Sequence, residues 1–452
     1  MAREKLVVIG GVAAGMSAAS RARRRNPELD IVVLEKGQHV SYGACGLPFY
    51  LSGEVADWKD LVVYTPEFFR EKRNIDVRLA HEAVEIEPGR KTVHALRPGS
   101  QPVAISYDKL VIAAGGAPAV NIPGADLPRV FTCNDLAGTI RLREFLEQKK
   151  PKRTVIVGSG YIGLEVADAF SRRGIEVTIL GRSECVLDGC ESEIGERVEA
   201  VLNAHGVRLE KKCAVTSITA AAGGDGLHVH HFGGSEAADV VLLATGIAPR
   251  ANLAESAGIV IGATGAIAVD ERMQTSVNSI YAAGDCVEVR HLVTGKPVYF
   301  PLGTTANKQG RVAGENAAGG NARFAGIVGT LATNVFELEV ARTGLSIQEA
   351  RANGFDPDSV TIHSLSHAKY LGGRPLTATF IWDRASERLL GFQVASEDGA
   401  AKRIDAAAVA LHARMRVPDM VHLDLSYAPP FATVWETLLI AAGEAMKKMR
   451  HI

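Results

Sequence analysis

The 452-residue chain has almost no net charge and no long apolar stretch. Its 50 Lys and Arg side chains are balanced by 51 Asp and Glu side chains, so the formal net charge is −1. A general nucleic-acid binder needs excess positive charge to displace the counterions of phosphates, and this chain has none. No stretch approaches the roughly 18 apolar residues of a membrane-spanning helix. We therefore expect neither nucleic acid nor a membrane as a partner.

Cysteine is also scarce, with six residues at irregular spacings. Disulfide frameworks belong mainly to short secreted chains. The first apolar run, residues 6–9, is too short for a secretion signal and is followed by glycines. We therefore predict reduced thiols and a cytoplasmic location, and we predict no metal site.

Glycine, by contrast, is abundant. The 46 glycines are clustered rather than periodic, which excludes a collagen-like chain. With 47% hydrophobic residues the chain can bury enough surface to fold. At roughly 100–200 residues per domain, the length predicts about three domains.

The first glycine cluster follows a short apolar run. A strand over 6–9 is predicted to lead into a turn over 10–15, a helix to Arg25 and a second strand that ends at Glu35. This order is that of a dinucleotide-binding βαβ unit. The middle position of the turn is Val12 rather than glycine, but Glu35 stands where an acid binds a ribose hydroxyl.

The same order returns in a second glycine cluster. Gly158, Gly160 and Gly163 form the complete dinucleotide fingerprint between a strand and a helix. These glycines allow a tight turn, close approach of the backbone to a pyrophosphate, and close helix–strand packing. The next strand ends at Gly181 and Arg182 rather than at an acid. Because an Arg at this position favours a 2′-phosphate, we predict NADPH in preference to NADH.

Two dinucleotide turns in one chain predict a flavoprotein that also binds a nicotinamide coenzyme. FAD would occupy the first unit and NAD(P)H the second. A strand over 280–284 ends at Asp285, which is predicted to bind the ribityl chain of the flavin. From about residue 325, strand-like runs precede helical ones, which indicates a separate α+β domain.

The predicted electron acceptor of the flavin is Cys45. It stands in the glycine-rich segment 41–48, after the first βαβ unit, and is predicted to open a helix. A helix N-terminus lowers the pKa of a thiol, and the thiolate is the reactive form. Cysteine statistics alone favour a buried, inert thiol. The position after a flavin-binding turn favours a reactive one.

These motifs resemble the single-cysteine branch of the pyridine nucleotide–disulfide oxidoreductases, and within it the coenzyme A disulfide reductases. The resemblance spans nearly the whole chain and is carried by residues 10–15, 41–48, 158–165, 281–285 and 427–431. It implies a homodimer with sites shared between subunits. The predicted fold class is α/β, with two Rossmann-like dinucleotide-binding domains for FAD and NAD(P)H and a C-terminal α+β dimerisation domain. The predicted boundaries are 1–118 and 246–324 for the FAD domain, 119–245 for the NAD(P)H domain and 325–452 for the dimerisation domain.

The resemblance also implies a reaction. Cys45 would alternate between a thiolate and a mixed disulfide with coenzyme A (CoA). NAD(P)H would reduce FAD, and reduced FAD would reduce Cys45–S–S–CoA, so that one CoA disulfide gives two CoA thiols. The Cys-x4-Cys pair of the two-cysteine reductases is absent, since Val40 and Tyr50 stand at the spacings where a second cysteine would lie. Cys185 and Cys190 have that spacing, but they follow the second unit and are interpreted as coincidental.

Candidate site residues follow from the motifs and from the resemblance. The catalytic candidates are Cys45, Tyr370 and Tyr427, the tyrosines coming from the partner subunit, although the 370–373 run departs from the family's pattern. The candidates for FAD are Gly10, Val12, Ala13, Ala14, Gly15, Glu35, Lys36, Cys45, Val84, Ala114, Gly115, Asp285 and Phe431. Those for NAD(P)H are Gly158, Gly160, Tyr161, Ile162, Gly163, Glu165, Arg182 and Gly246. Those for CoA are Ser17, Arg21, Arg24, Ser41, Ala44, Arg73, Asn307 and Trp435.

Three alternatives stay open. A CoA-dependent per- or polysulfide reductase would use the same flavin, cysteine and CoA pocket. An NADH oxidase or peroxidase would cycle Cys45 through a sulfenic acid. Those relatives carry a His in the first glycine turn, where this chain has Ala13. A flavoprotein that hands electrons to another protein would not need a thiol in the 41–48 segment.

Overall fold

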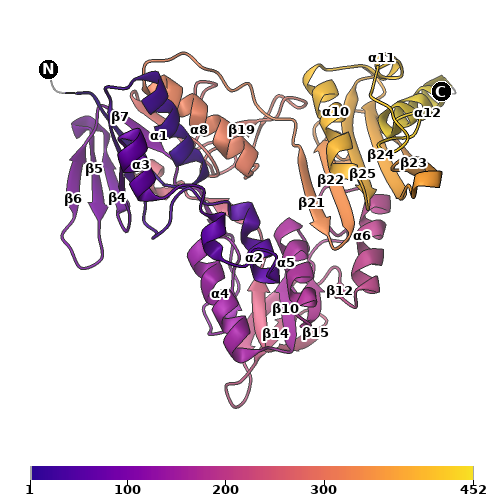
Figure 1. Ribbon diagram of the computed structural model, residues 1–452, viewed down its shortest axis with the longest axis horizontal. Helices are drawn as coiled ribbons and strands as arrows, with labels where there is room; N and C mark the ends of the chain where they lie inside the picture. The colour runs from indigo at the N-terminus through magenta and orange to yellow at the C-terminus, as the bar shows by residue number, and fades with distance from the viewer. Residues whose placement is uncertain (1–2, 451–452) are drawn as a thin grey trace.

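The computed structural model describes residues 3–450 and has three parts, each built on its own large β-sheet (Figure 1). The first part is an α/β unit with a five-stranded parallel sheet in the order β18-β7-β1-β2-β3. Its strands are β1 (Lys5–Ile9), β2 (Asp30–Leu34), β3 (Asp76–Arg78), β7 (Lys109–Ile112) and β18 (Ile280–Ala282).

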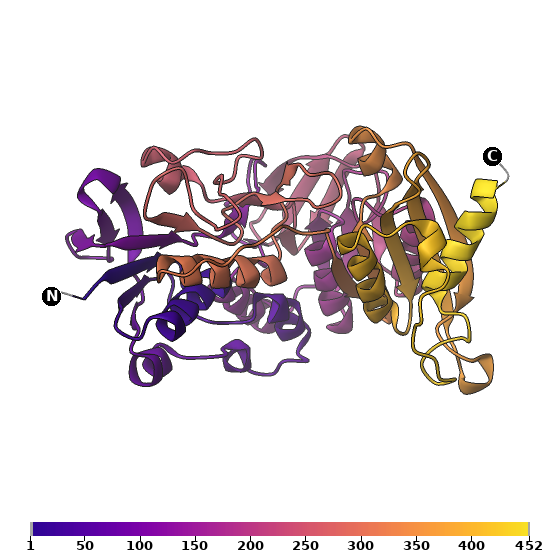
Figure 2. The ribbon, with the colours of Figure 1, turned by 90° about the horizontal axis from the view of Figure 1, so that it is seen from above.

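Alternate side chains of β1 point to opposite faces of this sheet. Leu6 and Val8 pack against helices α1 (Ala13–Arg25) and α8 (Gly303–Ala317), which lie side by side (Figure 2). Val7 and Ile9 pack against a small antiparallel sheet on the other face. That sheet consists of β4 (Glu82–Glu87), β5 (Thr92–Leu96) and β6 (Val103–Ser106). The short helices α2 (Leu47–Ser52) and α3 (Pro66–Arg73) follow β2 in the chain.

The second part repeats this plan. Its parallel sheet has the order β12-β11-β10-β16-β9, and a small antiparallel sheet covers one face. The parallel strands are β9 (Val130–Phe131), β10 (Arg153–Val157), β11 (Glu176–Leu180), β12 (Arg208–Glu210) and β16 (Val240–Leu243). The helices are α4 (Leu136–Lys149), α5 (Tyr161–Arg172) and α6 (Ser192–Ala204). The small sheet contains β13 (Val215–Ala220), β14 (Leu227–His231) and β15 (Gly234–Ala238).

The chain crosses between the first two parts at two adjacent strands. β8 (Gly116–Pro118) leads out of the first part, and β17 (Ile247–Pro249) returns beside it in antiparallel pairing. The segment after this return includes α7 (Asn252–Ser256), β18, β19 (Val289–Arg290), β20 (Pro297–Val298) and α8. The first part is therefore discontinuous in sequence, and the exact domain boundaries stay predictions.

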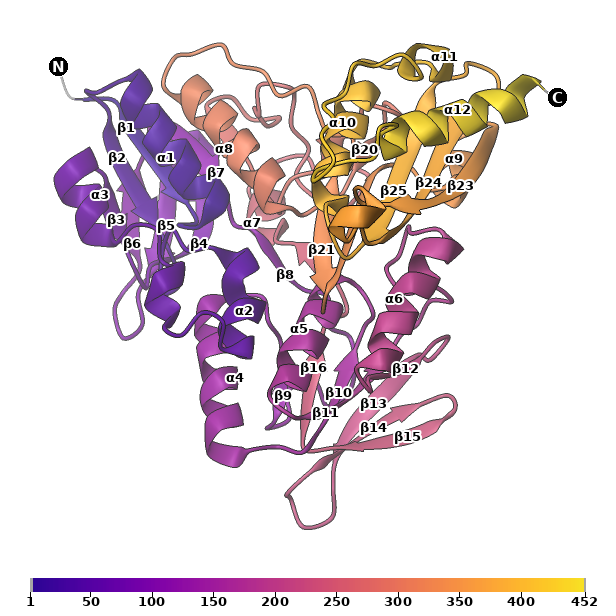
Figure 3. The same ribbon diagram turned by 45° about the vertical axis from the view of Figure 1, so that its right-hand side comes forward.

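The third part is an antiparallel sheet in the order β21-β22-β25-β24-β23. Its central strands β24 and β25 are buried almost throughout, because α10 and α12 cover one face and α6 of the second part packs on the other (Figure 3). The strands are β21 (Leu331–Val335), β22 (Leu338–Gly344), β23 (Pro357–Leu365), β24 (Pro375–Asp383) and β25 (Leu389–Ser396). The helices are α9 (Ile347–Ala352), α10 (Ala400–His412), α11 (Val417–Met420) and α12 (Thr437–Arg450).

The predicted fold class is confirmed, with two α/β units followed by an α+β unit. Between residues 3 and 450, no helix is both long enough and apolar enough to cross a bilayer.

Candidate active site

The first glycine turn joins β1 to α1 with almost no room for side chains. Gly10 has a φ of +101°, and a Cβ there would lie 2.1 Å from the carbonyl oxygen of Ala113. A Cβ on Gly15 would lie 1.8 Å from the carbonyl oxygen of Gly10. No side chain caps α1 at Val12, so the first N–H groups of the helix are open to a ligand. This arrangement fits the pyrophosphate of a dinucleotide.

Glu35 completes this turn from the end of β2. Its buried carboxylate accepts hydrogen bonds from Gly11 N at 2.7 Å and Gly37 N at 2.6 Å. The carboxylate therefore lies beside the turn, where the ribose of a dinucleotide is bound in such folds. Asp285 follows β18 at the same edge of the sheet, and burial raises the pKa of its carboxyl.

The other FAD candidates fall into two groups, those near the turn and those that are exposed. Ala13 and Ala14 open α1, and Ala114 and Gly115 lie just after β7, at the same edge of the sheet as Asp285. Four candidates are exposed: Lys36, Cys45, Val84 on β4 and Phe431 in the third part. A single chain does not bring Phe431 into the pocket described below.

The second glycine turn has nearly the same backbone. Gly158 has a φ of +113°, and a Cβ there would lie 2.2 Å from the carbonyl oxygen of Ala244. A Cβ on Gly163 would lie 2.1 Å from Gly158 O. A Cβ on Gly160 would meet no atom within 4 Å, so this face of the turn is open to a ligand. The residues fit a second dinucleotide.

The surroundings of the second turn differ from those of the first. β11 is followed by Gly181, which offers no carboxylate, and then by the exposed Arg182. On α5, the Glu165 carboxylate accepts a hydrogen bond from Thr333 Oγ1 at 2.8 Å, and burial raises its pKa. Burial also raises the pKa of Tyr161, whose hydroxyl has no hydrogen-bond partner among residues 3–450.

Cys45 lies in a short 3-10 turn, Ala44–Gly46, directly before α2. Its Sγ is 3.9 Å from the Cβ position of Gly303, the first residue of α8. The residue is exposed, yet desolvation by the surrounding protein raises the pKa of its thiol, and the carboxylates of Glu165 and Asp285 raise it further. The expectation of a lowered pKa is wrong for the groups of this chain. The cysteine precedes a helix of only six residues, whose N-terminus does not outweigh desolvation and two carboxylates.

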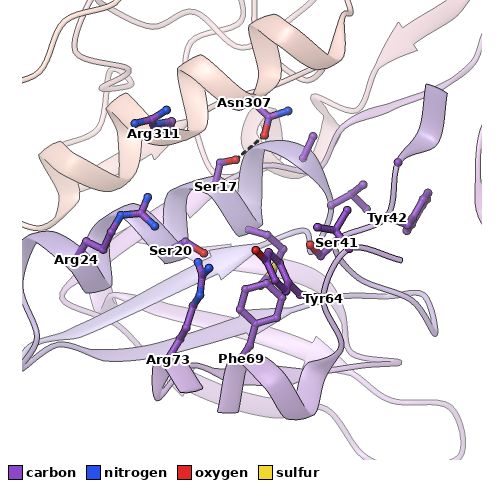
Figure 4. A pocket seen from close by; sticks show the side chains of 15 residues that line it. Ser17, Ser20, Arg24, Ser41, Tyr42, Tyr64, Phe69, Arg73, Asn307 and Arg311 are labelled. Carbon is purple, nitrogen blue, oxygen red and sulfur yellow. Dashed lines mark hydrogen bonds between the residues drawn. The ribbon is translucent and has the colours of Figure 1, made fainter. Parts of the chain in front are cut away.

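A pocket of about 520 Å³ lies between α1, α3 with the segment leading into it, and α8 (Figure 4). Ser41, Tyr42 and Gly43, just before Cys45, line one part of it. Arg24, Arg73 and Arg311 come from three different helices and line another part, and no acidic side chain lines the pocket. Burial and neighbouring arginines, chief among them Arg73, lower the pKa of Arg24. The pocket is therefore electropositive and suits an anion.

Arg73 is held in place on two sides. Its guanidinium lies 5.1 Å from the ring centre of Tyr64 and 5.6 Å from that of Phe69. Arg23, behind it, donates from Nε to Arg73 O at 3.0 Å and from Nη2 to Asn74 O at 2.6 Å. The side chain is thus oriented before any ligand binds.

The structure brings together five of the eight CoA candidates as lining residues: Ser17, Arg24, Ser41, Arg73 and Asn307. Ser17 Oγ donates to Asn307 Oδ1 at 2.7 Å and so joins α1 to α8. Ala44 adjoins the pocket in sequence without lining it. Arg21 is turned away, because its Nε pairs with Glu315 Oε2 at 2.6 Å.

Sequence reasoning missed Arg311, Ser20, Tyr64 and Phe69, which also line the pocket. Helical spacing in the sequence could have identified two of them. Ser20 lies three residues after Ser17 on α1, and Arg311 lies four residues after Asn307 on α8, so each shares a helix face with a predicted residue.

The remaining candidates belong to the third part. Tyr370, Tyr427 and Trp435 have exposed side chains, with Tyr370 77% exposed, and none of them lines the pocket. Their segments meet, since Ala368 N donates to Pro429 O at 3.1 Å. Within one chain the tyrosines form an exposed surface of their own.

Family models match most of the chain. Residues 4–310 match the pyridine nucleotide-disulphide oxidoreductase model, and residues 331–439 match the dimerisation domain of the same family. The chain belongs to this family. The resemblance found in the sequence is thereby confirmed, and the protein is an NAD(P)H-dependent flavoprotein oxidoreductase that uses FAD, acting on disulfides or sulfur.

The chain also aligns over nearly its whole length with curated proteins and with a solved structure. A curated protein named NAD(P)H sulfur oxidoreductase (CoA-dependent), from Pyrococcus furiosus, is 41% identical over 447 residues, covering 98% of this chain and 99% of its own. Coenzyme A disulfide reductase of Staphylococcus haemolyticus is 28% identical over 431 residues, covering 95% and 96%. The solved NAD-dependent persulfide reductase from A. fulgidus superposes with a TM-score of 0.96 at 39% identity, covering 99% of this chain and 84% of that one.

Proposed function

We propose that this oxidoreductase reduces sulfur–sulfur bonds of CoA-linked substrates at Cys45, with CoA persulfide or polysulfide as the preferred substrate. The identities of the relatives support this preference. The relatives at 39–41% identity are named for sulfur or persulfide, whereas the Staphylococcus haemolyticus CoA disulfide reductase is 28% identical. CoA disulfide, the substrate predicted from the sequence, is the second candidate, because the same thiol and pocket serve either molecule.

The observation that carries the proposal is the position of α8. This helix begins beside the Cys45 thiol and continues along the pocket through Asn307 to Arg311. At 1.5 Å per residue, the eight steps from Gly303 to Arg311 span about 12 Å. A thiol at one end and arginines at the other match CoA, which carries its sulfur and its phosphates at opposite ends.

The arginines would hold the phosphates of CoA. Arg24, Arg73 and Arg311 offer planar donor groups that match phosphate oxygens. Ser17, Ser41 and Asn307 supply neutral donors and acceptors along the arm. These contacts would present the CoA sulfur to Cys45 from one direction.

Cys45 would then attack as the thiolate. On CoA persulfide, a bond forms between Cys45 Sγ and the CoA sulfur while the S–S bond to the outer sulfur breaks, and hydrosulfide leaves. On CoA disulfide, a CoA thiolate leaves instead. When bound, FAD supplies the two electrons, taken from NAD(P)H, that the resulting mixed disulfide requires. Reduction breaks the Cys45–S–S–CoA bond and restores both thiolates.

A homodimer would complete the site. The exposed surface that bears Tyr370, Tyr427, Phe431 and Trp435 lies within the region matched by the dimerisation model. We propose that Tyr427 and Tyr370 of a second subunit reach the cysteine and donate to the leaving CoA sulfur. A cytoplasmic location, where thiols stay reduced, agrees with the six unpaired cysteines.

The test is anaerobic oxidation of NADPH with CoA persulfide, polysulfide plus CoA, or CoA disulfide as sole acceptor. Wild type should turn over fastest with the persulfide. Cys45→Ser should reduce turnover by roughly three orders of magnitude, as expected for loss of a nucleophile. Cys133→Ser, which removes a buried thiol that lies outside the pocket and beside Thr139, is the matched control and should keep wild-type rates.

Other outcomes would change the conclusion. Faster turnover with CoA disulfide than with persulfide would promote the second candidate. Rapid oxidation by O₂ alone, or full activity of Cys45→Ser, would exclude thiol–CoA chemistry altogether.

A further inference from the structure

The loop that joins β11 to α6, residues 181–191, runs along the dimerisation domain. Gln393 of β25, only 1% exposed, faces this loop. Its Nε2 donates to Gly189 O at 2.9 Å, and its Oε1 accepts from Glu191 N at 2.7 Å. The Glu191 carboxylate accepts in turn from Ile347 N at 2.8 Å. Backbone groups of the loop are therefore bound by another domain instead of by water.

Arg342 of β22 holds the same segment. Its buried guanidinium donates from Nη1 to Asp188 O at 3.2 Å and pairs through Nη2 with Glu349 Oε2 at 2.6 Å. Gly189 has a φ of +83°, and a Cβ there would lie 1.5 Å from Arg342 Nη1. Because residue 189 has no side chain, the arginine guanidinium lies where a Cβ would otherwise be.

The opposite side of the loop borders the second glycine turn. Leu187 N donates to Ser159 O at 3.1 Å, inside the turn. At the start of the loop, a Cβ on Gly181 would lie 2.8 Å from Ser159 Oγ, and Arg182 follows. The same loop thus adjoins the pyrophosphate turn and carries the position that distinguishes a ribose from its 2′-phosphate.

We infer that Arg342 and Gln393 are positioning residues for the nicotinamide coenzyme. They hold residues 188–191, and through Leu187 and Ser159 they set the position of the coenzyme-binding turn. The dimerisation domain thereby contributes to coenzyme affinity through the loop. This inference rests on the family's use of NAD(P)H and is independent of the CoA-linked substrate.

The physical reason is hydrogen bonding in a buried interface. If Gln393 is replaced by an apolar side chain, Gly189 O and Glu191 N lose their partners. Unpaired buried backbone groups are costly, so the loop would move to reach water. Movement at residue 189 would be transmitted to Leu187 and from there to Ser159 of the turn.

The test uses the FAD-loaded protein and calorimetric titration with NADP⁺ and NAD⁺. Gln393→Leu keeps nearly the same volume and should weaken binding of both coenzymes about tenfold, the effect of one lost buried interaction. Arg342→Lys keeps the charge beside Glu349 and should weaken binding less than Arg342→Met. The FAD content and the affinity for CoA should stay at wild-type values.

Thr377→Val is the matched control. It removes an interdomain hydrogen bond, Arg197 Nη1 to Thr377 Oγ1 at 3.4 Å, that does not involve residues 181–191. It should leave coenzyme affinity unchanged. The inference is overturned if Gln393→Leu lowers only the melting temperature while coenzyme affinity stays within about twofold. If Gln393→Leu does not fold, equal coenzyme affinity of Arg342→Met and wild type overturns it instead.

Discussion

The two glycine turns share a backbone but differ in what surrounds them. Gly10 and Gly158 have φ values of +101° and +113°, and each lies against the carbonyl of the residue that follows the neighbouring strand. At the end of the next strand, Glu35 offers a buried carboxylate bound to its own turn, whereas Gly181 offers no side chain. The turn establishes that a dinucleotide binds, and the residue at the second strand's end helps to select which one.

The two turns also have different neighbours. The first lies beside α8 and the Cys45 thiol, both within reach of the arginine-lined pocket. The second borders a loop that is held by Arg342 and Gln393 of the dimerisation domain. One copy of the βαβ unit is therefore placed next to the Cys45 segment and the arginine-lined pocket, and the other is placed next to the dimerisation domain.

The largest loss of cofactor binding should follow replacement of the third glycine in either turn. Gly15→Ala and Gly163→Ala would each place a Cβ about 2 Å from a backbone oxygen, so the turn must shift. We expect Gly15→Ala to be purified without FAD. Gly163→Ala should keep FAD and bind NADP⁺ at least about tenfold more weakly, which is a loss of roughly 1.4 kcal/mol. Flavin absorbance measures the FAD content, and calorimetric titration measures the affinity for NADP⁺. Loss of FAD from both variants would show that the two sites do not act separately.

The second-largest effect, a weaker hold on FAD, should come from replacing Glu35, the residue whose counterpart in the second unit is Gly181. Glu35→Gln keeps the shape of the side chain but removes the charge that Gly11 N and Gly37 N bind, so FAD should dissociate about tenfold more readily. To measure the FAD that remains bound, each protein is dialysed in a buffer that stabilises the FAD-free form, and its flavin content is then assayed. Glu85→Gln, on an exposed strand position of the same part, is the control. Equal retention of FAD in all three proteins would contradict the role of Glu35.

A smaller effect is expected at the second strand's end. Gly181→Asp introduces the acid that the second unit lacks, and Arg182→Ala removes the cation. Each should shift the NADPH-to-NADH ratio of kcat/KM toward NADH by roughly five- to tenfold, since an acid repels a 2′-phosphate and an arginine attracts it. Steady-state kinetics with both coenzymes measures the ratio. An unchanged ratio in both variants would place coenzyme selection elsewhere.

The smallest effect concerns the pH dependence of alkylation at the Cys45 thiol. Burial and the carboxylates of Glu165 and Asp285 raise the pKa of Cys45, so alkylation of the FAD-loaded enzyme should keep rising at alkaline pH. Glu165→Gln removes a negative charge that disfavours the thiolate, so the inflection should move to lower pH. Glu196→Gln, on the exposed face of α6, should leave it in place. A shift to higher pH in Glu165→Gln would contradict the assigned cause.

Much of the fold followed from local sequence. Gly10 and Gly158 have positive φ values, and a Cβ on Gly15 or Gly163 would meet a backbone oxygen, so glycine spacing alone predicted both βαβ units. The pocket was predicted only in part. Arg21 and Arg24 share one basic helix, yet Glu315 of α8 pairs with Arg21 and leaves Arg24 to the pocket. No local pattern identifies such a partner.

The sequence by itself determined the two dinucleotide units, the position of the cysteine and the family, because these depend on short-range spacing and on glycine stereochemistry. Only the tertiary structure decided which arginines line the pocket, in which direction the pKa of Cys45 moves, and that Gln393 and Arg342 hold the coenzyme loop. These properties arise where segments distant in sequence meet, and burial and charge at such contacts depend on the packed chain as a whole.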